Sequence, residues 1–270
     1  MSFAGRLRDA INAANSLLCV GLDPDIGTAA TADAAERFCI EILEAALPHA
    51  AAVKPNLAFF EQHGSAGYAV LERLRARIPG DRLLLLDAKR GDIGTTAEAY
   101  ARALFDVLGA DAVTVNPLMG EDSVRPFLER SGRGCFVITR TSNPGAADLM
   151  EQPLSEGGPL YLHIAALVES WDGLGNAGLV VGATAPDAVA ALRRRLPHMP
   201  FLIPGVGAQG GSLEDAVVAG IDSDGAGVLI NVSRGISAAA EGAAIAAATY
   251  AQRLRTARAD AVAELTGHTG

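Results

Sequence analysis

Residues 82–96 read RLLLLDAKRGDIGTT, a run of four leucines that ends in a dense group of opposite charges. The leucines predict a strand that is buried on both faces, because a strand with one solvated face alternates apolar and polar residues. Asp87, Lys89, Arg90 and Asp92 then follow within six positions, so we expect this strand to end at a polar site. The same pattern recurs along the chain and decides the fold.

Eight apolar runs of this kind are expected to be strands, each ending in a polar or glycine residue. They lie at residues 17–23, 51–56, 82–89, 112–117, 135–142, 178–184, 201–207 and 227–233. Helical patterns separate them, as at residues 31–47, 65–78, 95–108 and 185–196. Eight strand-helix units in about 250 residues match a closed, parallel (β/α)8 barrel. An open doubly wound sheet is the alternative, since alternation does not establish closure.

No interdomain linker interrupts these units, so residues 1–270 are expected to form a single (β/α)8 TIM barrel of the α/β class. The stretch 1–18 has the pattern of a short amphipathic helix, and the Ala-rich stretch 237–265 that of the last helix. Residues from about 257 to 270 are expected to be a frayed tail.

The composition excludes several classes of protein. With 22 basic and 31 acidic residues the net charge is −9, which argues against a nucleic-acid or anionic-membrane surface. Cys19, Cys39 and Cys135 are odd in number and widely spaced, which is typical of reduced core thiols in a cytoplasmic protein. No apolar run reaches the length of a signal peptide core or a membrane span, and the scattered histidines offer no zinc set.

Only two of the 22 basic residues are lysine, and both Lys54 and Lys89 fall at the carboxyl ends of expected strands. An ammonium group is compact and can give up a proton, whereas a guanidinium is bulky and effectively never deprotonates. The two lysines therefore indicate sites where arginine would not serve. Coincidence of codon bias and drift is the alternative.

Strand geometry predicts how these charges meet. Asp87 and Lys89 are two residues apart and share one face, and Lys54 ends the neighbouring strand at about the same level. The expected result is a row of cation, anion and cation, which Asp92 extends from the loop and which keeps the ammonium groups protonated. Two structural alternatives stay open. Asp92 or the TTAE sequence at 95–98 would cap the next helix, or Lys54 and Asp87 would be a structural ion pair.

The last two strands indicate a phosphate site. IPGVGAQGGSLEDA at 203–216 is a Gly-rich turn before a helix, and NVSRGIS at 231–237 places Arg234 beside it. Backbone N–H groups and the helix dipole at such a turn favour an anion. The long segment 143–159 after the fifth strand is expected to be either a lid or a disordered insertion.

These motifs together resemble the orotidine 5′-phosphate decarboxylase family. DAKRGDIGTT is similar to its Asp-x-Lys-x-x-Asp signature in the bacterial form Asp-Ala-Lys-Arg-Gly-Asp-Ile-Gly, and GLDPD, VKPNLAFFE, TSNPG, IPGVGAQGG and NVSRGI follow in family order over nearly the whole chain. The resemblance implies a carboxy-lyase that converts orotidine 5′-phosphate to UMP and carbon dioxide, the last step of de novo pyrimidine synthesis. It implies no metal and no organic cofactor.

Carried over by position, the resemblance gives each residue a role. Lys89 is the proton donor to C6 of the pyrimidine, and Asp87 faces the departing carboxylate. Lys54 and Asp92 complete the charge network and contact the ribose, as does Asp23. These roles belong to the family and are expectations for this chain.

The resemblance also implies a homodimer whose subunits share active sites. The residues lent to the partner's site would be Asp92, Ile93 and Thr96. Ser142 matches the serine that bonds the pyrimidine edge, with Thr139 and Thr141 as nearby alternatives. The residues around the phosphate would be Pro204, Gly205, Gly207, Gln209 and Arg234. Gly94 departs from the family pattern, because many members have proline there.

Two rival functions remain. Related barrels with a similar Asp-x-Lys-x-x-Asp are metal-dependent decarboxylases or epimerases of keto-sugar phosphates, in which the carboxylates hold magnesium. The same fold could also serve a non-catalytic phosphonucleoside-binding protein, since fold does not assign activity.

Overall fold

A computed structural model describes residues 2–155 and 157–267 of the chain. Its strands form one closed barrel in sequence order, with every neighbouring pair parallel and β8 beside β1. The predicted (β/α)8 barrel is therefore confirmed, and the open-sheet alternative is wrong. The strands are β1 (Leu18–Leu22), β2 (Ala52–Pro55), β3 (Leu83–Arg90), β4 (Ala112–Val115), β5 (Gly134–Arg140), β6 (Ala177–Val181), β7 (Phe201–Ile203) and β8 (Val228–Val232).

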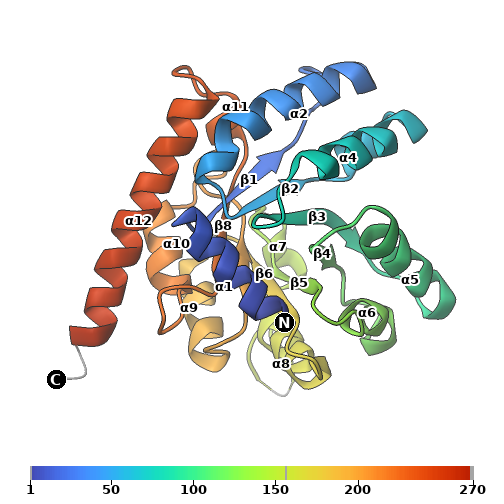
Figure 1. Ribbon diagram of the computed structural model, residues 1–270. Helices are drawn as coiled ribbons and strands as arrows, with labels where there is room; N and C mark the ends of the chain where they lie inside the picture. The colour runs from blue at the N-terminus through green and yellow to red at the C-terminus, as the bar shows by residue number, and fades with distance from the viewer. Residues whose placement is uncertain (1, 156, 268–270) are drawn as a thin grey trace.

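Helices surround the barrel on the outside (Figure 1). Helix α2 begins after a side-chain cap, since the Thr31 hydroxyl accepts the Ala34 N–H. The helices are α1 (Phe3–Ala14), α2 (Ala32–Ala46), η1 (Leu47–His49), α3 (Ala58–Glu61), α4 (Ser65–Arg77), α5 (Gly94–Ala101), the π-helix η2 (Arg102–Val107), α6 (Glu121–Leu128), α7 (Ala146–Leu149), α8 (Leu160–Trp171), α9 (Pro186–Arg195), α10 (Leu213–Gly220), α11 (Arg234–Ser237) and α12 (Ala243–Gly267).

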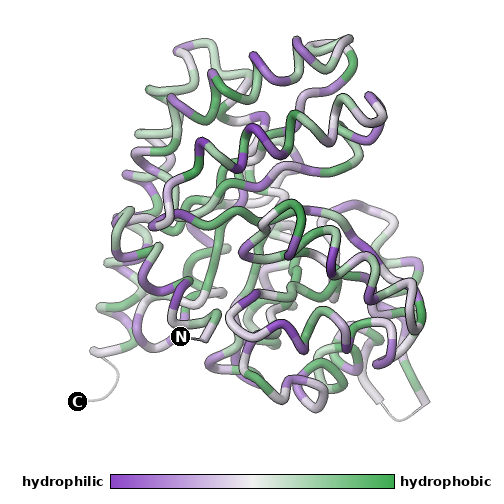
Figure 2. The backbone as a smooth tube through the Cα atoms, turned by 45° about the vertical axis from the view of Figure 1, so that its right-hand side comes forward, coloured by the Kyte–Doolittle hydropathy of each residue, from purple (hydrophilic) through white to green (hydrophobic). Residues whose placement is uncertain are grey.

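The core lies inside the barrel and between the strands and the helices. Every residue of the seven other strands is buried, and β3 is buried through Leu86 and becomes partly exposed only from Asp87 onward. Hydrophobic stretches run through the middle of the molecule in Figure 2, as expected for strands covered on both faces. The leucine run of β3 thus ends where the barrel opens to solvent.

Helix α1 lies across the amino-terminal mouth of the barrel (Figure 1). Phe3 packs edge-on against Phe136 of β5 with 5.8 Å between ring centroids, and Arg6 pairs with the buried Asp111 at 2.5 Å. Because this mouth is filled by side chains, the open mouth is the one at the carboxyl ends of the strands.

The carboxyl-terminal segment differs from the expectation. Helix α12 continues to Gly267, and Ala257 and Ala261 are buried against the body of the protein, so the prediction of a frayed tail is wrong for residues 257–267. Residues 268–270 lie outside the described residues. No helix in the described part of the chain has the length and apolar character that crossing a membrane requires.

Candidate active site

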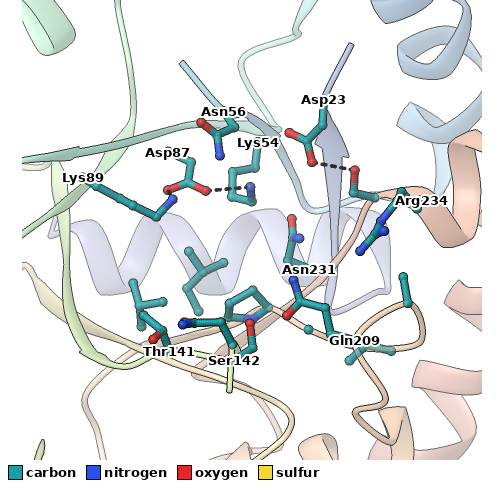
Figure 3. Close-up of a pocket in the computed structure, with 18 of the residues that line it drawn as sticks. Asp23, Lys54, Asn56, Asp87, Lys89, Thr141, Ser142, Gln209, Asn231 and Arg234 are labelled. Atoms are coloured by element: carbon teal, nitrogen blue, oxygen red, sulfur yellow. Dashed lines mark hydrogen bonds and ion pairs between the residues drawn. The ribbon is translucent and has the colours of Figure 1, made fainter. Parts of the chain in front are cut away.

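A cavity of about 500 Å³ opens at the carboxyl ends of the strands. Charged and amide side chains face one another across it in Figure 3, and apolar side chains from β5, β6 and β7 supply part of its wall. The predicted site residues that line this cavity are Asp23, Lys54, Asp87, Lys89, Ser142, Pro204, Gly205, Gln209 and Arg234. The apolar wall includes Ile138, Val180 and Leu202.

Asp87 lies between the two lysines, as strand geometry predicted (Figure 3). The Lys54 ammonium donates to Asp87 Oδ2 at 3.1 Å, and the Lys89 ammonium donates to Asp87 Oδ1 at 2.6 Å. The side chains differ in exposure, at 5% for Lys54, 12% for Asp87 and 49% for Lys89. The row therefore begins at a buried lysine and ends at one that reaches into the open cavity.

The row fixes the charge of its buried members. Burial by itself would lower the pKa of the Lys54 ammonium, but the carboxylates of Asp87 and Asp23 outweigh burial and raise that pKa above its ordinary value. Burial alone would raise the pKa of the Asp87 carboxyl, but Lys54 and Lys89 outweigh it and hold that pKa well below its ordinary value. Lys54 stays a cation and Asp87 an anion near neutral pH.

The backbone that presents Lys89 is irregular, which the sequence did not reveal. Lys89 has a φ of +48°, in the left-handed region that non-glycine residues rarely adopt. The pairing of β3 with β4 also shifts register between Leu86 and Arg90. Thr114 of β4 contacts both ends of this irregular stretch. Its hydroxyl oxygen lies 2.9 Å from the backbone nitrogen of Lys89 and 2.9 Å from Asp87 Oδ1.

Several polar residues that line the cavity were not predicted as site residues from the sequence. Asn56 and Asn231 stand at the ends of β2 and β8, and Ser233 donates to Asp23 Oδ2 at 2.6 Å. Asp23 Oδ1 and Asn231 Oδ1 are buried without a hydrogen-bond partner among the described residues. Buried polar atoms are normally paired, so these two oxygens favour a ligand with hydrogen-bond donors. Their signal was present in the polar strand ends VKPN and NVS.

The opposite side of the cavity carries a cation and a tight turn. Arg234 is exposed and lacks a side-chain partner within the described residues, so its guanidinium is open to an anion. Gly205 has a φ of +101°, and a Cβ there would come within 2.6 Å of the Ser142 Cβ. Gly207 does not line the cavity, and its N–H donates to the Gly211 carbonyl at 3.0 Å. Gly207 therefore shapes the turn.

The three candidate hydroxyls at the end of β5 differ in their access to the cavity, with Thr139 inside the strand and Thr141 and Ser142 just after it. Thr141 and Ser142 line the cavity, whereas Thr139 is fully buried outside it and donates to the Val137 carbonyl at 3.0 Å. A role for Thr139 in contacting a ligand in the cavity is therefore wrong for this structure. Thr141 and Ser142 remain.

Arg140 at the end of β5 ties the following segment to the barrel. Its guanidinium donates to Glu151 Oε1 at 2.6 Å and to the Thr141 carbonyl at 2.7 Å. Thr184 adds a bond from its hydroxyl to the Ser142 carbonyl at 3.0 Å. The described residues of 143–159 include helix α7 and a bridge between residues 153 and 159, so the disordered alternative does not hold for them.

Besides Gly207, three predicted residues lie outside this cavity. Asp92 Oδ1 accepts the N–H of Ile93 at 2.7 Å, and Ile93 and Thr96 are exposed. Helix α5 begins at Gly94 without a side-chain cap, so both capping interpretations, by Asp92 and by the 95–98 sequence, are wrong. Gly94 has a φ of +53°, which proline with its φ near −65° does not adopt, so this loop has a shape of its own.

The described residues contain no group of three or more His, Cys, Asp or Glu arranged to hold a metal ion.

A family model described as orotidine 5′-phosphate decarboxylase / HUMPS family matches residues 16–249. The chain is 49% identical over 265 residues to the orotidine 5′-phosphate decarboxylase of Roseiflexus castenholzii. The matched region covers 95% of this chain and 97% of the relative. It is similar to the solved structure of Leishmania donovani OMP decarboxylase, with 43% identity, a TM-score of 0.88 and coverage of 96% and 99% of the two chains.

Proposed function

The chain belongs to the orotidine 5′-phosphate decarboxylase / HUMPS family, and from this premise we propose that it converts orotidine 5′-phosphate to UMP and carbon dioxide, with Lys89 as the proton donor. The observation that carries the proposal is the row in which Asp87 separates Lys54 from Lys89 at one side of a cavity whose other side holds Arg234. A cavity with separate charged ends suits a substrate that carries both a carboxylate and a phosphate.

The reaction follows from these charges. The bond between C6 and the carboxylate breaks, its electron pair stays on C6, and carbon dioxide leaves. The Lys89 ammonium stabilises the negative charge that develops on C6 and then transfers a proton to it, which yields UMP and a neutral lysine that regains a proton from water. A fixed ammonium at the developing charge costs no reorganisation during the reaction.

The other members of the row support this role of Lys89. Asp87 fixes the Lys89 ammonium from one side and lies where the substrate carboxylate would approach it. Lys54, held charged and buried, keeps Asp87 ionised and contributes to binding the ribose together with Asp23. The apolar wall of Ile138, Val180 and Leu202 suits the flat pyrimidine, and Ser142 offers a hydrogen bond to its edge. Gln209 belongs with the residues proposed for the phosphate.

The phosphate is proposed to bind at the turn after β7 and at Arg234, where Pro204 and Gly205 shape the backbone. This interaction is remote from C6, so its energy is available for ordering the loops over the site. The free guanidinium of Arg234 and the positive φ of Gly205 support the assignment.

We also propose a homodimer in which each subunit completes its partner's site. Asp92, Ile93 and Thr96 follow the charge row directly in sequence, yet lie outside the cavity of their own chain. A surface position suits residues that act on a second subunit. A cytoplasmic location is proposed as well, supported by three cysteines that are all free and buried.

The test is the ultraviolet absorbance of orotidine 5′-phosphate, which changes as the substrate becomes UMP. We expect turnover that a chelator does not abolish, whereas loss of activity with EDTA would favour the metal-dependent rival. Lys89→Ala should lower kcat by at least about 10⁴-fold, and Lys89→Arg should fail similarly, since arginine keeps the charge but not the transferable proton. UMP should still bind to both variants through the phosphate end, which shows that they are folded. Ordinary turnover by Lys89→Ala would refute the mechanism, and UMP binding without turnover by the wild-type chain would favour a binding protein.

A further inference from the structure

Strand β4 places one hydroxyl group beside the charge row. Thr114 is 1% exposed and lies between Val113 and Val115, whose side chains are fully buried. It does not line the cavity, so it has no direct access to a ligand there. A lone hydroxyl in an apolar strand needs partners, because a buried polar group without a hydrogen bond is destabilising.

The first partner is the backbone of β3. Leu86 pairs with Val113 and Arg90 pairs with Val115, so the three residues 87–89 stand opposite Thr114 alone. This bulge removes the Lys89 N–H from the regular ladder and gives Lys89 its φ of +48°. The hydroxyl of Thr114 accepts this N–H at 2.9 Å and so takes the place of the missing backbone carbonyl.

The second partner is the carboxylate of Asp87. The hydroxyl of Thr114 donates to Asp87 Oδ1 at 2.9 Å, the same oxygen that receives the Lys89 ammonium. A hydroxyl carries one donor and two acceptor positions, so both bonds form at once. One side chain thereby holds the backbone at Lys89 and the carboxylate that orients the Lys89 ammonium.

We propose that Thr114 is a positioning residue that holds the bulge of β3 and thereby aims the Lys89 ammonium into the cavity. Thr114 acts through Asp87 and Lys89 and contacts no substrate atom. The inference rests on the proposed function, since it assumes that the position of Lys89 limits the decarboxylation. Strained backbone beside a reacting group persists only where neighbouring contacts hold it, and Thr114 supplies such a contact.

The test compares variants of similar shape. Thr114→Val removes the hydroxyl at almost constant volume and should lower kcat by about 10- to 100-fold with KM changed less than about threefold, because a hydrogen bond to a charged group is lost. Thr114→Ser should recover most of kcat. If the valine variant does not fold, the ratio of the kcat of Thr114→Ser to that of Thr114→Ala measures the contribution of the hydroxyl. Thr139→Val is the matched control, because it removes a fully buried barrel hydroxyl that faces away from the cavity. Its kcat should stay within about twofold of the wild type.

A second measurement needs no turnover. Hydrogen exchange of the Lys89 amide should be faster in Thr114→Val than in the wild type or in Thr139→Val, while UMP affinity should be kept. An unchanged kcat in a Thr114→Val protein that binds UMP, or a serine variant no better than the alanine variant, would overturn the inference. Absence of turnover in the wild type would instead overturn the proposed function, so the two failures are distinguishable.

Discussion

Replacing Asp87 by asparagine leaves the buried ammonium of Lys54 without its closest negative partner. The Lys54 side chain is 5% exposed and bonds Asp87 at 3.1 Å, so solvent compensates poorly for the lost carboxylate. Removing one member of a buried ion pair costs about 3–5 kcal/mol, and the lower end applies because Asp23 still acts on Lys54. We expect Asp87→Asn to lose about 3 kcal/mol at pH 7, or roughly 6–12 °C in Tm for a chain of this size.

The sign of the pH dependence follows from the shifted pKa values. In the wild type the Lys54 pKa is raised, so its contribution is complete below the unfolded value of about 10.4 and is lost only as pH rises through the folded pKa. The Asp87 pKa is depressed, so its contribution is complete above about 3.9 and is lost as pH falls. In Asp87→Asn burial dominates and lowers the Lys54 pKa below its unfolded value, so the variant gains stability as pH rises toward about 10.4. The difference in free energy of unfolding between the wild type and Asp87→Asn should therefore become smaller from pH 7 to pH 9.

Urea unfolding at several pH values measures this difference. Glu44→Gln is the matched control, since it makes the same carboxylate-to-amide change in an exposed ion pair with Arg77. The side chain of Arg77 is 49% exposed and that of Glu44 is 67% exposed. The control should change the free energy of unfolding by less than about 0.5 kcal/mol, with no trend between pH 7 and 9. A loss below about 1 kcal/mol for Asp87→Asn at pH 7, or a difference that stays constant to pH 9, would refute the reasoning.

Two further predictions concern the dimer and the segment after β5. Lys89→Ala and Asp92→Ala should each be inactive, but a mixture after subunit exchange should regain about a quarter of wild-type activity, because half of the dimers then hold one intact site of two. Gel filtration and the absorbance assay measure this, and no recovery contradicts shared sites. Arg140→Met should raise KM about tenfold with a smaller effect on kcat, because Arg140 holds the backbone next to Ser142. Glu151→Gln should have a smaller effect, and an unchanged KM in Arg140→Met would show that Arg140 does not position this segment.

The sequence predicted the barrel because its strands carry a strong local signal. Each strand is apolar on both faces and stops at a polar or glycine residue. The structure has a strand in every predicted range, although β3 runs on to Arg90, β5 begins at Gly134 and β6 begins at Ala177. The pairing of Asp87 with both Lys54 and Lys89 could also be predicted, since carboxyl ends of adjacent parallel strands meet at one mouth.

The surroundings of the charge row could not be predicted in the same way. Asn231 and Ser233 are polar residues at a strand end, and only the closed barrel shows that both of them line the cavity. Asp92 was expected to extend the row, yet it lies outside the cavity of its own chain. A single sequence carries no signal for the relative position of a second subunit, so the place of Asp92 in a dimer stays a prediction.

The orientation of the Lys89 side chain was predicted correctly, but regular alternation along a strand does not explain it. Regular alternation would place Asp87 and Lys89 on one face, but β3 is not regular there, because residues 87–89 bulge opposite Thr114 and Lys89 has a positive φ. The two side chains still meet because Asp87 bonds the ammonium and Thr114 bonds both residues. The continuous run of leucines therefore specifies the strand, whereas the Thr114 hydroxyl on the next strand orients the lysine at its end. A chain that kept every hydrophobic position and lost Thr114 would be expected to form the same barrel with a misplaced Lys89 ammonium.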